Sequence, residues 1–426
     1  MNAPVDRKSS LYLPALVALL AAFFGAKTLK CGSGVTPPFI PPGSLVPSLP
    51  SWPVFNVAVR LNGLFSYLAE VTAPPNVRLH KMAGATWVVS GYVARALALH
   101  EIPDAIAAHG GSLTVGEIAA KTGTNPEILK RYLDAAEKMG LVATKRVGSR
   151  DGTKTTFRLT STGELLRKDV VGSLRDMVLM MGQSYVHDAN RAAGEVTLKA
   201  KVPRSGFFEA NGKEQWNWFN DGHLEEMNEF DRTMTAFGTE MSTAIIADWV
   251  PPSEEFKFCD IAGGHGTTLA LILQHYPRAE GIVFDRPEVV PAAREYLQEQ
   301  GIADRASAVG GDFFDSSTMQ ELRSCDVFLL KWIIHNWDDK HSIEILRNLR
   351  RVGQEGARLL ISDFVVGTSS IRDFELVKAQ SDIFMLGMCP IGAKERTEAD
   401  FLRLLNEAGY PQESKLVSLR TLISLL

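Results

Sequence analysis

The chain is poor in cysteine and has no general excess of basic charge, and both shortages exclude classes of protein. Its 426 residues include four cysteines, Cys31, Cys259, Cys325 and Cys389, and no two of them have CxxC spacing. Neither a zinc site nor a disulfide framework is implied, so we expect reduced, buried thiols. The formal net charge of −4 disfavours a partner held by electrostatic attraction, nucleic acid above all.

The N-terminus carries an apolar run that differs from the rest of the chain. Residues 11–26 are mostly apolar and have lysine or arginine on both sides. The run is shorter than the roughly 20 residues of a spanning helix. A basic flank and an apolar centre also suit a targeting segment, although Phe24 stands where a cleavage site favours a small residue. Residues 1–30 are therefore a targeting segment, a membrane anchor or, as a third alternative, a buried helix.

This segment sets the expected location of the protein. Targeting would send it to an organelle, a plastid or a mitochondrion, whereas anchoring would associate it with a membrane through residues 11–26. In both cases we expect a soluble catalytic domain. Residues 31–53 follow as a linker, because they contain seven prolines and several glycines, which resist regular structure.

Residues 54–170 have the pattern of a helical domain that ends in a winged helix-turn-helix. Apolar spacing predicts helices near 54–68 and 77–99, and Asn125 and Pro126 suit the start of a helix that runs to about Met139. Two strands are predicted at 141–144 and 155–159. The basic residues of the would-be recognition helix are offset by acidic ones, so a role in dimerisation or in covering a substrate is favoured over DNA binding. These residues are Lys130, Arg131 and Lys138 against Glu127, Asp134 and Glu137.

Residues 171–426 alternate strands and helices in the order of an α/β, doubly wound, Rossmann-like sheet. Parallel crossovers bring the carboxyl ends of the strands to one edge, where we expect Gly263, Asp285, Asp312 and His335 to converge. The predicted strands are 256–262, 280–285, 305–309, 326–331 and 357–364, with a terminal pair in 415–426. The predicted helices are 267–276, 288–300, 340–352 and 397–408.

The converging residues suit an adenosine cofactor. The turn with Gly263, Gly264 and Gly266 lets the backbone approach a ligand at a helix N-terminus. Asp285 can accept hydrogen bonds from both ribose hydroxyls, and Asp312 with Phe313 can bind and cover the adenine. A dinucleotide is disfavoured because Leu269 stands where its fingerprint requires glycine. S-adenosylmethionine (SAM) fits better.

In these motifs the chain resembles the SAM-dependent O-methyltransferases of the caffeate, flavonoid and hydroxyindole type. The resemblance covers about residues 79–426 and is strongest at 260–266, 331–339 and 392–397. It implies a methyltransferase domain, an N-terminal helical dimerisation domain and SAM as the cofactor. It also implies a homodimer whose interlocked N-terminal helices help to close the partner's pocket for a small-molecule acceptor.

The resemblance also assigns site residues. His335 matches the general base, Glu395 an acid that flanks it, and Asp363 a second flanking acid that is commonly glutamate. Ala262 replaces a usual glycine and Asn336 a usual aspartate. No metal is required, since Asp338 and Asp339 are explained as acids at a helix N-terminus. The cofactor-binding positions are Asp260, Gly263, Gly264, Gly266, Asp285, Asp312, Phe313, Lys331 and Trp337.

The acceptor is less well defined than the cofactor. A histidine with a pKa of about 6.5 suits removal of a hydroxyl proton at neutral pH. The alternative is S-methylation of 4-methylthio-2-hydroxybutyrate in dimethylsulfoniopropionate synthesis, where a thioether needs no base. A non-catalytic SAM-binding regulator is a remote third hypothesis. Expected acceptor-lining residues, about half of which we expect to be ordinary core, are Met177, Met180, Met181, Tyr185, Trp216, Trp218, Met385 and Met388.

Overall fold

The computed structural model describes residues 85–149, 152–170, 172–369 and 372–411, with isolated residues between 57 and 73. Our predictions for residues 1–30, for the linker 31–53 and for the terminal strands in 415–426 lie outside the described residues. Within the part that is described, every helix is too short or too polar to cross a bilayer.

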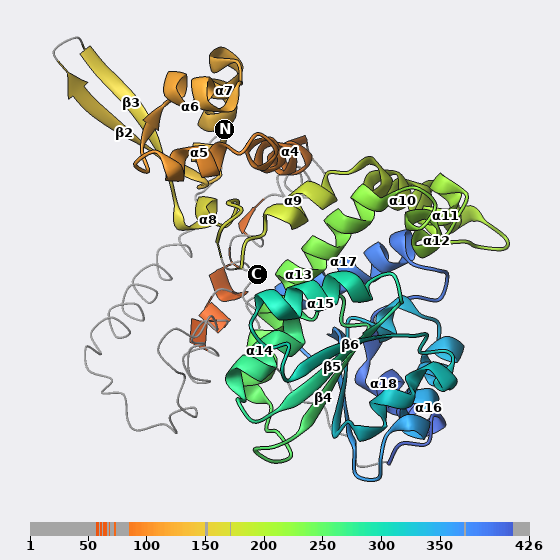
Figure 1. The fold of residues 1–426 in the computed structure, drawn as a ribbon. Coiled ribbons are helices and arrows are strands. Elements are labelled where there is room, and N and C mark those ends of the chain that lie inside the picture. Colours follow the sequence, from red (N-terminus) through yellow and green to blue (C-terminus); the bar gives the residue numbers. More distant parts are fainter. Residues whose placement is uncertain are drawn as a thin grey trace, which may run out of the picture. The chain divides into compact units, whose positions relative to one another are not determined.

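The first described domain is a winged helix (Figure 1). Thr114 and Glu117 form a capping box at the start of α6, and Gly123 ends that helix in the left-handed conformation. Asn125 caps α7, and β2 and β3 form the predicted antiparallel hairpin, which β1 extends. The elements are α4 (Ala85–Leu99), α5 (Ile102–Ala108), β1 (Leu113–Thr114), α6 (Val115–Thr122), α7 (Pro126–Lys138), β2 (Val142–Ser149), β3 (Gly152–Leu159) and α8 (Ser161–Glu164).

The second domain contains a five-stranded sheet with the order β6-β5-β4-β7-β8, and all its pairings are parallel. The chain order reverses between β4 and β7, which is where doubly wound sheets bind ligands. The predicted fold class is therefore confirmed. The strands are β4 (Lys257–Ile261), β5 (Glu280–Asp285), β6 (Ala306–Gly310), β7 (Val327–Lys331) and β8 (Arg358–Ser362).

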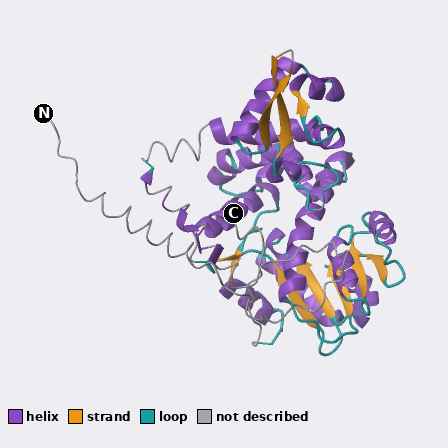
Figure 2. Cartoon of the chain, turned by 90° about the vertical axis from the view of Figure 1, so that its left-hand side faces the viewer, coloured by secondary structure: helices purple, strands orange, loops and turns teal. Residues whose placement is uncertain are grey.

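Helices cover both faces of this sheet (Figures 1 and 2). Alternate residues of each strand point to opposite faces, so Phe328 and Leu330 join one core while Val327 and Leu329 join the other. One core is completed by α16 (Asp339–Val352) and α18 (Glu398–Glu407), together with the 3-10 helix η3 (Ser316–Ser324). The other is completed by α14 (Thr267–His275), α15 (Val290–Glu299) and the end of α13 (Leu224–Asp248).

Additional helices form a cap with its own core, which the sequence pattern did not predict. Aromatic and methionine side chains from these helices pack together, among them Tyr185, Phe207, Phe219 and Met385. The cap helices, besides the first part of α13, are α9 (Arg175–Met181), α10 (Ser184–Glu195), α11 (Gly206–Asn211), α12 (Gln215–Phe219) and α17 (Arg372–Met388).

The expectation that all cysteines are reduced is wrong for two of them. Cys259 and Cys325 form a disulfide, with 6.0 Å between their Cα atoms. Cys259 lies in β4, and Cys325 comes just before β7, the strand that pairs with β4. Sheet pairing thus brings together two cysteines that are 66 residues apart in sequence, which spacing alone does not reveal. Cys389 is a free, buried thiol as expected.

Candidate active site

The turn after β4 requires glycine at two positions for steric reasons. A Cβ atom at Gly263 would lie 2.7 Å from the Asp260 carboxyl carbon, and one at Gly266 would lie 2.6 Å from Val283 Cγ2. Gly266 also has a φ of 86°, in the region that favours glycine. Ala262 adopts a positive φ of 54° despite its side chain, so its replacement of the usual glycine preserves the turn.

Asp285 ends β5 and faces this glycine turn. Its two carboxylate oxygens accept hydrogen bonds from the backbone N–H groups of Gly264 (2.8 Å) and Arg286 (2.7 Å). Burial raises the pKa of Asp285, although these two hydrogen bonds oppose the rise. Each oxygen keeps a further lone pair, so the carboxylate can still accept hydrogen bonds from a ligand.

Asp260 and Lys331 place opposite charges beneath the same edge of the sheet. Asp260 is 1% exposed, and one of its oxygens has no hydrogen-bond partner within the described structure. Burial raises the pKa of Asp260 to about 6, against the influence of Lys331. Burial lowers the pKa of Lys331, while Asp260 and Asp363 oppose that change. Lys331 therefore lies between Asp260, which precedes the glycine turn, and Asp363, which contacts the His335 turn.

Asp312 and Phe313 follow β6 and meet an aromatic cluster. Phe313 and Phe314 each contact the Trp337 ring in a perpendicular arrangement, at centroid distances of 5.8 and 4.9 Å. The exposed Asp312 carboxylate accepts a hydrogen bond from the Phe314 N–H. Three predicted cofactor positions, Asp312, Phe313 and Trp337, are thus brought together although they come from different strand ends.

His335 lies in a short 3-10 turn, η4 (Ile334–Asn336), just after β7. Its ring Nδ1 is 3.0 Å from Glu395 Oε1, and both side chains are buried. Ser381 donates a hydrogen bond to the same Glu395 oxygen at 2.7 Å, and Asp382 accepts one from the Glu395 N–H at 2.8 Å. Glu395 is therefore fixed from α17 on one side while it holds the imidazole on the other.

Asp363 supports His335 differently from Glu395. It accepts a hydrogen bond from the backbone N–H of His335 at 3.1 Å, so its side chain anchors the turn and not the ring. Burial on its own would lower the pKa of His335, but the charges of Asp363 and Glu395 outweigh it, and the pKa is raised. Burial, with Glu395 nearby, raises the pKa of Asp363.

Several neighbours of the site were not predicted from the sequence. Ser381 and Asp382 lie in α17, a helix without a strong apolar period, and Asp231 lies in α13. Burial raises the pKa of Asp231 to about 6, and the charges of His265 and Asp285 affect it, which places it beside the glycine turn and the end of β5. Asn336, which replaces the usual aspartate, donates its side-chain amide to the Trp332 carbonyl at 2.9 Å and so bonds to the backbone of its own segment.

The predicted acceptor-lining residues divide into two groups. Four of the eight are buried in the cap core, namely Met180, Tyr185, Met385 and Met388, whereas Met181 is 39% exposed. Trp216 and Trp218 are partly buried against that core, and Met177 is also partly buried. The Arg286 guanidinium lies 5.5 Å from the centre of the Trp216 ring. Trp216 therefore connects the aromatic cap to the strand end that carries Asp285.

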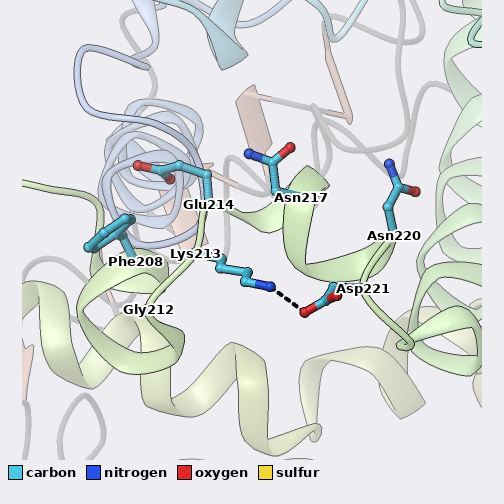
Figure 3. Close-up of a pocket in the computed structure, with 7 residues that line it drawn as sticks. All are labelled: Phe208, Gly212, Lys213, Glu214, Asn217, Asn220 and Asp221. Atoms are coloured by element: carbon cyan, nitrogen blue, oxygen red, sulfur yellow. Dashed lines mark hydrogen bonds and ion pairs between the residues drawn. The ribbon is translucent and has the colours of Figure 1, made fainter.

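A separate hollow lies between α11 and α12 on the cap (Figure 3). Lys213 and Asp221 form an ion pair across it. None of the predicted site residues lines this hollow, so it is not the candidate active site. Its lining residues are Phe208, Gly212, Lys213, Glu214, Asn217, Asn220 and Asp221.

Two family models match the chain. Residues 197–411 match the O-methyltransferase domain, and residues 88–169 match the O-methyltransferase dimerisation domain. Among curated proteins, the phenazine O-methyltransferase PhzM of Lysobacter antibioticus is 32% identical over 70% of this chain and 81% of its own length. The 8-amino-8-demethylriboflavin N,N-dimethyltransferase of Streptomyces davaonensis is 30% identical over 75% of this chain and 86% of its own.

Solved structures show the same likeness. The LaPhzM crystal structure superposes with a TM-score of 0.66 at 28% identity, over 79% of this chain and 94% of that one. The calicheamicin-biosynthesis methyltransferase CalO1, solved with S-adenosylhomocysteine bound, gives a TM-score of 0.64 at 27% identity over 82% and 96%. Both similarities extend across the predicted dimerisation and methyltransferase regions.

Proposed function

Because the chain belongs to the SAM-dependent O-methyltransferase family, we propose that it methylates a phenolic or indolic hydroxyl of a small planar acceptor with His335 as general base. The observation that supports this proposal most directly is the buried hydrogen bond between His335 Nδ1 and Glu395. Such a pair is useful where a proton must leave the acceptor.

The residues at the sheet edge fit SAM as the cofactor. Glycines at 263 and 266 leave room that a side chain would fill, and the buried Asp260 has an oxygen free of partners in the described structure. We assign Asp285 to the ribose hydroxyls, and Asp312, Phe313 and Trp337 to the adenine. Lys331 completes the set from the neighbouring strand. When bound, SAM supplies an electrophilic methyl group on a sulfonium.

The protein's part in the reaction is to remove a proton and to stabilise the resulting charge. A neutral hydroxyl is a poor nucleophile until a base takes its proton. Glu395 engages Nδ1 of His335, which leaves Nε2 to accept the hydroxyl proton. The Glu395 carboxylate then stabilises the imidazolium that forms. The remaining members of the site, Asp363 and Ser381, hold the turn and the carboxylate in place.

Methylation of sulfur is a weaker proposal on this geometry. A thioether such as 4-methylthio-2-hydroxybutyrate has no proton to lose, so the buried His335–Glu395 pair would have only a positioning role. A SAM-binding protein without turnover would likewise have no use for a base. Amines must also be tested as acceptors, because the relative from Streptomyces davaonensis is named as an N,N-dimethyltransferase.

Product analysis distinguishes these chemistries. The fragment from Ser51 would be incubated with SAM and a panel of catechols, flavonoids, hydroxyindoles, aminophenols and 4-methylthio-2-hydroxybutyrate, followed by mass spectrometry. We expect a methyl ether of a phenol or an indole. A sulfonium product, or SAM binding without any product, would contradict the proposed reaction.

We further propose that residues 1–30 target the protein to an organelle or attach it to a membrane. The proposal is supported by the apolar run 11–26 and its basic flanks. A fusion of residues 1–53 to a fluorescent protein, imaged and then extracted with alkaline carbonate, separates the two outcomes. Import with cleavage indicates targeting, retention in the pellet indicates an anchor, and a diffuse soluble fusion would contradict both.

A further inference from the structure

Arg396 directly follows Glu395 in the chain and is 1% exposed. Removal of a guanidinium from water costs free energy unless its N–H groups find acceptors. The groups that accept from Arg396 therefore show what the side chain holds in place. They belong to the turn that carries His335 and to the helix that follows it.

The contacts of Arg396 enclose this turn. Nη1 donates to the Ile334 carbonyl at 2.8 Å, and Nη2 donates to the Trp337 carbonyl at 2.7 Å. These two carbonyls lie one residue before and two residues after His335. The same guanidinium donates to Asp339 Oδ1 from Nε at 3.2 Å and from Nη2 at 2.8 Å. A planar guanidinium with donors on three nitrogens suits this set of acceptors, whereas an ammonium group does not.

The turn has limited support of its own. It is a single 3-10 turn of three residues, in which the Ile334 carbonyl accepts the Trp337 N–H, while the Trp337 carbonyl accepts from side chains outside the turn, Arg396 and Ser342. The segment with Glu395 and Arg396 is tied to the chain that follows β8, because β10 (Arg396–Thr397) pairs with β9 (Val365–Val366) in a separate two-stranded sheet. The Lys394 N–H adds a hydrogen bond to the His335 carbonyl at 2.9 Å. Three successive residues, 394 to 396, thus each form a hydrogen bond with the turn.

We propose that Arg396 is a positioning residue that locks the His335 turn against the segment that carries Glu395, so that the base and its carboxylate keep hydrogen-bond geometry during turnover. This inference rests on the proposed role of His335 as general base. It assigns a function to a buried residue whose hydrogen bonds go to the turn and to Asp339.

Removal of Arg396 takes away both a positive charge and a set of hydrogen bonds, and these two losses would shift the pKa of His335 in opposite directions. The charged groups around His335 are Asp363 after β8, Glu395 before β10, Asp382 on α17, Lys331 at the end of β7 and Arg396 itself. Loss of a nearby positive charge would by itself raise the pKa of His335. A looser contact with Glu395 would lower that pKa, because this hydrogen bond helps to raise it.

The test is an NMR titration of histidine ring carbons in the full-length protein, with the His335 signal assigned as the one that disappears in His335→Gln. We expect Arg396→Ala to lower the pKa of His335. With an acceptor in hand, we also expect kcat to fall by about 10²-fold, as for a misplaced catalytic group, with SAM affinity unchanged. The matched control is Arg403→Ala, since Arg403 also binds Asp339 but is not bonded to the turn carbonyls in the described structure.

The pKa of His335 and the kcat of Arg396→Ala can each contradict the proposed role of Arg396. If the pKa of His335 and the kcat per folded enzyme are both unchanged in Arg396→Ala, Arg396 has only a structural role and the proposal is contradicted. If the pKa of His335 rises, Arg396 acts only through its charge, which also contradicts the proposal. If Arg396→Ala does not fold, Arg396→Lys is titrated in its place, and we expect a smaller fall in the pKa of His335. The titration needs no acceptor, so the absence of hydroxyl methylation in the wild-type protein would contradict the proposed function without deciding the result for Arg396.

Discussion

His335 depends on contacts from segments that are far apart in the sequence. Asp363 holds its backbone, Glu395 holds its ring, and Ser381 holds Glu395. The sequence predicts the first two partners because each belongs to a family motif. It does not predict Ser381, since a serine in the middle of a helix carries no signal until the fold places it beside a buried carboxylate.

The pH dependence of turnover provides a test at the residue scale. The pKa of His335 is raised, and the base works only when it is deprotonated, so kcat/KM should rise with pH and level off above the ordinary histidine value of about 6.5. Glu395→Gln removes one cause of the raised pKa. We expect its rising limb to move to lower pH and its plateau to fall, as measured by initial rates from pH 5.5 to 9. A limb that stays in place would contradict the role of Glu395.

Asp285 is predicted to contribute to cofactor affinity. Its carboxylate accepts two backbone hydrogen bonds and has lone pairs left for a ribose. Asp285→Ala should weaken SAM binding by about 1–3 kcal/mol, the cost of unsatisfied polar groups. Isothermal calorimetry measures this directly, with the exposed helix-cap variant Asp315→Ala as control. Equal affinity of the Asp285 variant and the control would remove the assignment.

At the scale of elements, the sequence predicts the strands of the sheet and the helices between them well. The strand predicted at 280–285 coincides with β5, that at 256–262 exceeds β4 by one residue at each end, and that at 326–331 exceeds β7 by one residue at its start. Continuous apolar runs bounded by polar turns give a strong signal for buried parallel strands. The two-residue strands β9 and β10 are too short for any periodicity, yet their pairing brings Asp363 and Glu395 to the same histidine.

The turn from β4 into α14 is a testable element. Gly266→Ala introduces both left-handed strain and a Cβ that would overlap Val283, so we expect a loss of about 2–4 kcal/mol in the free energy of unfolding. Gly301 also has a positive φ but faces open space, so Gly301→Ala should cost only about 1 kcal/mol. Urea denaturation of both variants gives the comparison. Equal losses would show that steric fit at the turn does not matter.

At the scale of the whole molecule, the sequence predicts the winged-helix and methyltransferase regions but not the helical cap, which combines α9–α12 with the first part of α13 and with α17. The long helix α13 passes over the carboxyl end of β7, where a Cβ at Gly238 would lie 3.3 Å from Lys331 Nζ. Its apolar and polar residues do not separate into clear faces, because it contacts the cap and the sheet along different parts of its length. Such a pattern arises from tertiary packing and cannot be read from periodicity.

The dimerisation-domain match leads to a prediction about assembly. Val89 lies on α4 within that domain and is 53% exposed, as expected for an apolar side chain that a second copy covers. Light scattering on the Ser51 fragment should give twice the mass of one chain. Val89→Asp should shift the protein towards monomer, whereas Leu198→Asp, at an apolar residue that is 79% exposed outside that domain, should not. A wild-type monomer with full activity would contradict the role of the domain.

The role of His335 as general base is tested by a comparison of His335→Ala with His341→Ala on the acceptor found by product analysis. His341 is a suitable control because it lies six residues further on and binds Asp338, not Glu395. We predict that His335→Ala lowers kcat by about 10²- to 10⁴-fold, the usual contribution of a general base, and leaves the calorimetric affinity for SAM unchanged, while His341→Ala retains turnover. Wild-type kcat in His335→Ala would contradict base-assisted hydroxyl methylation at this site.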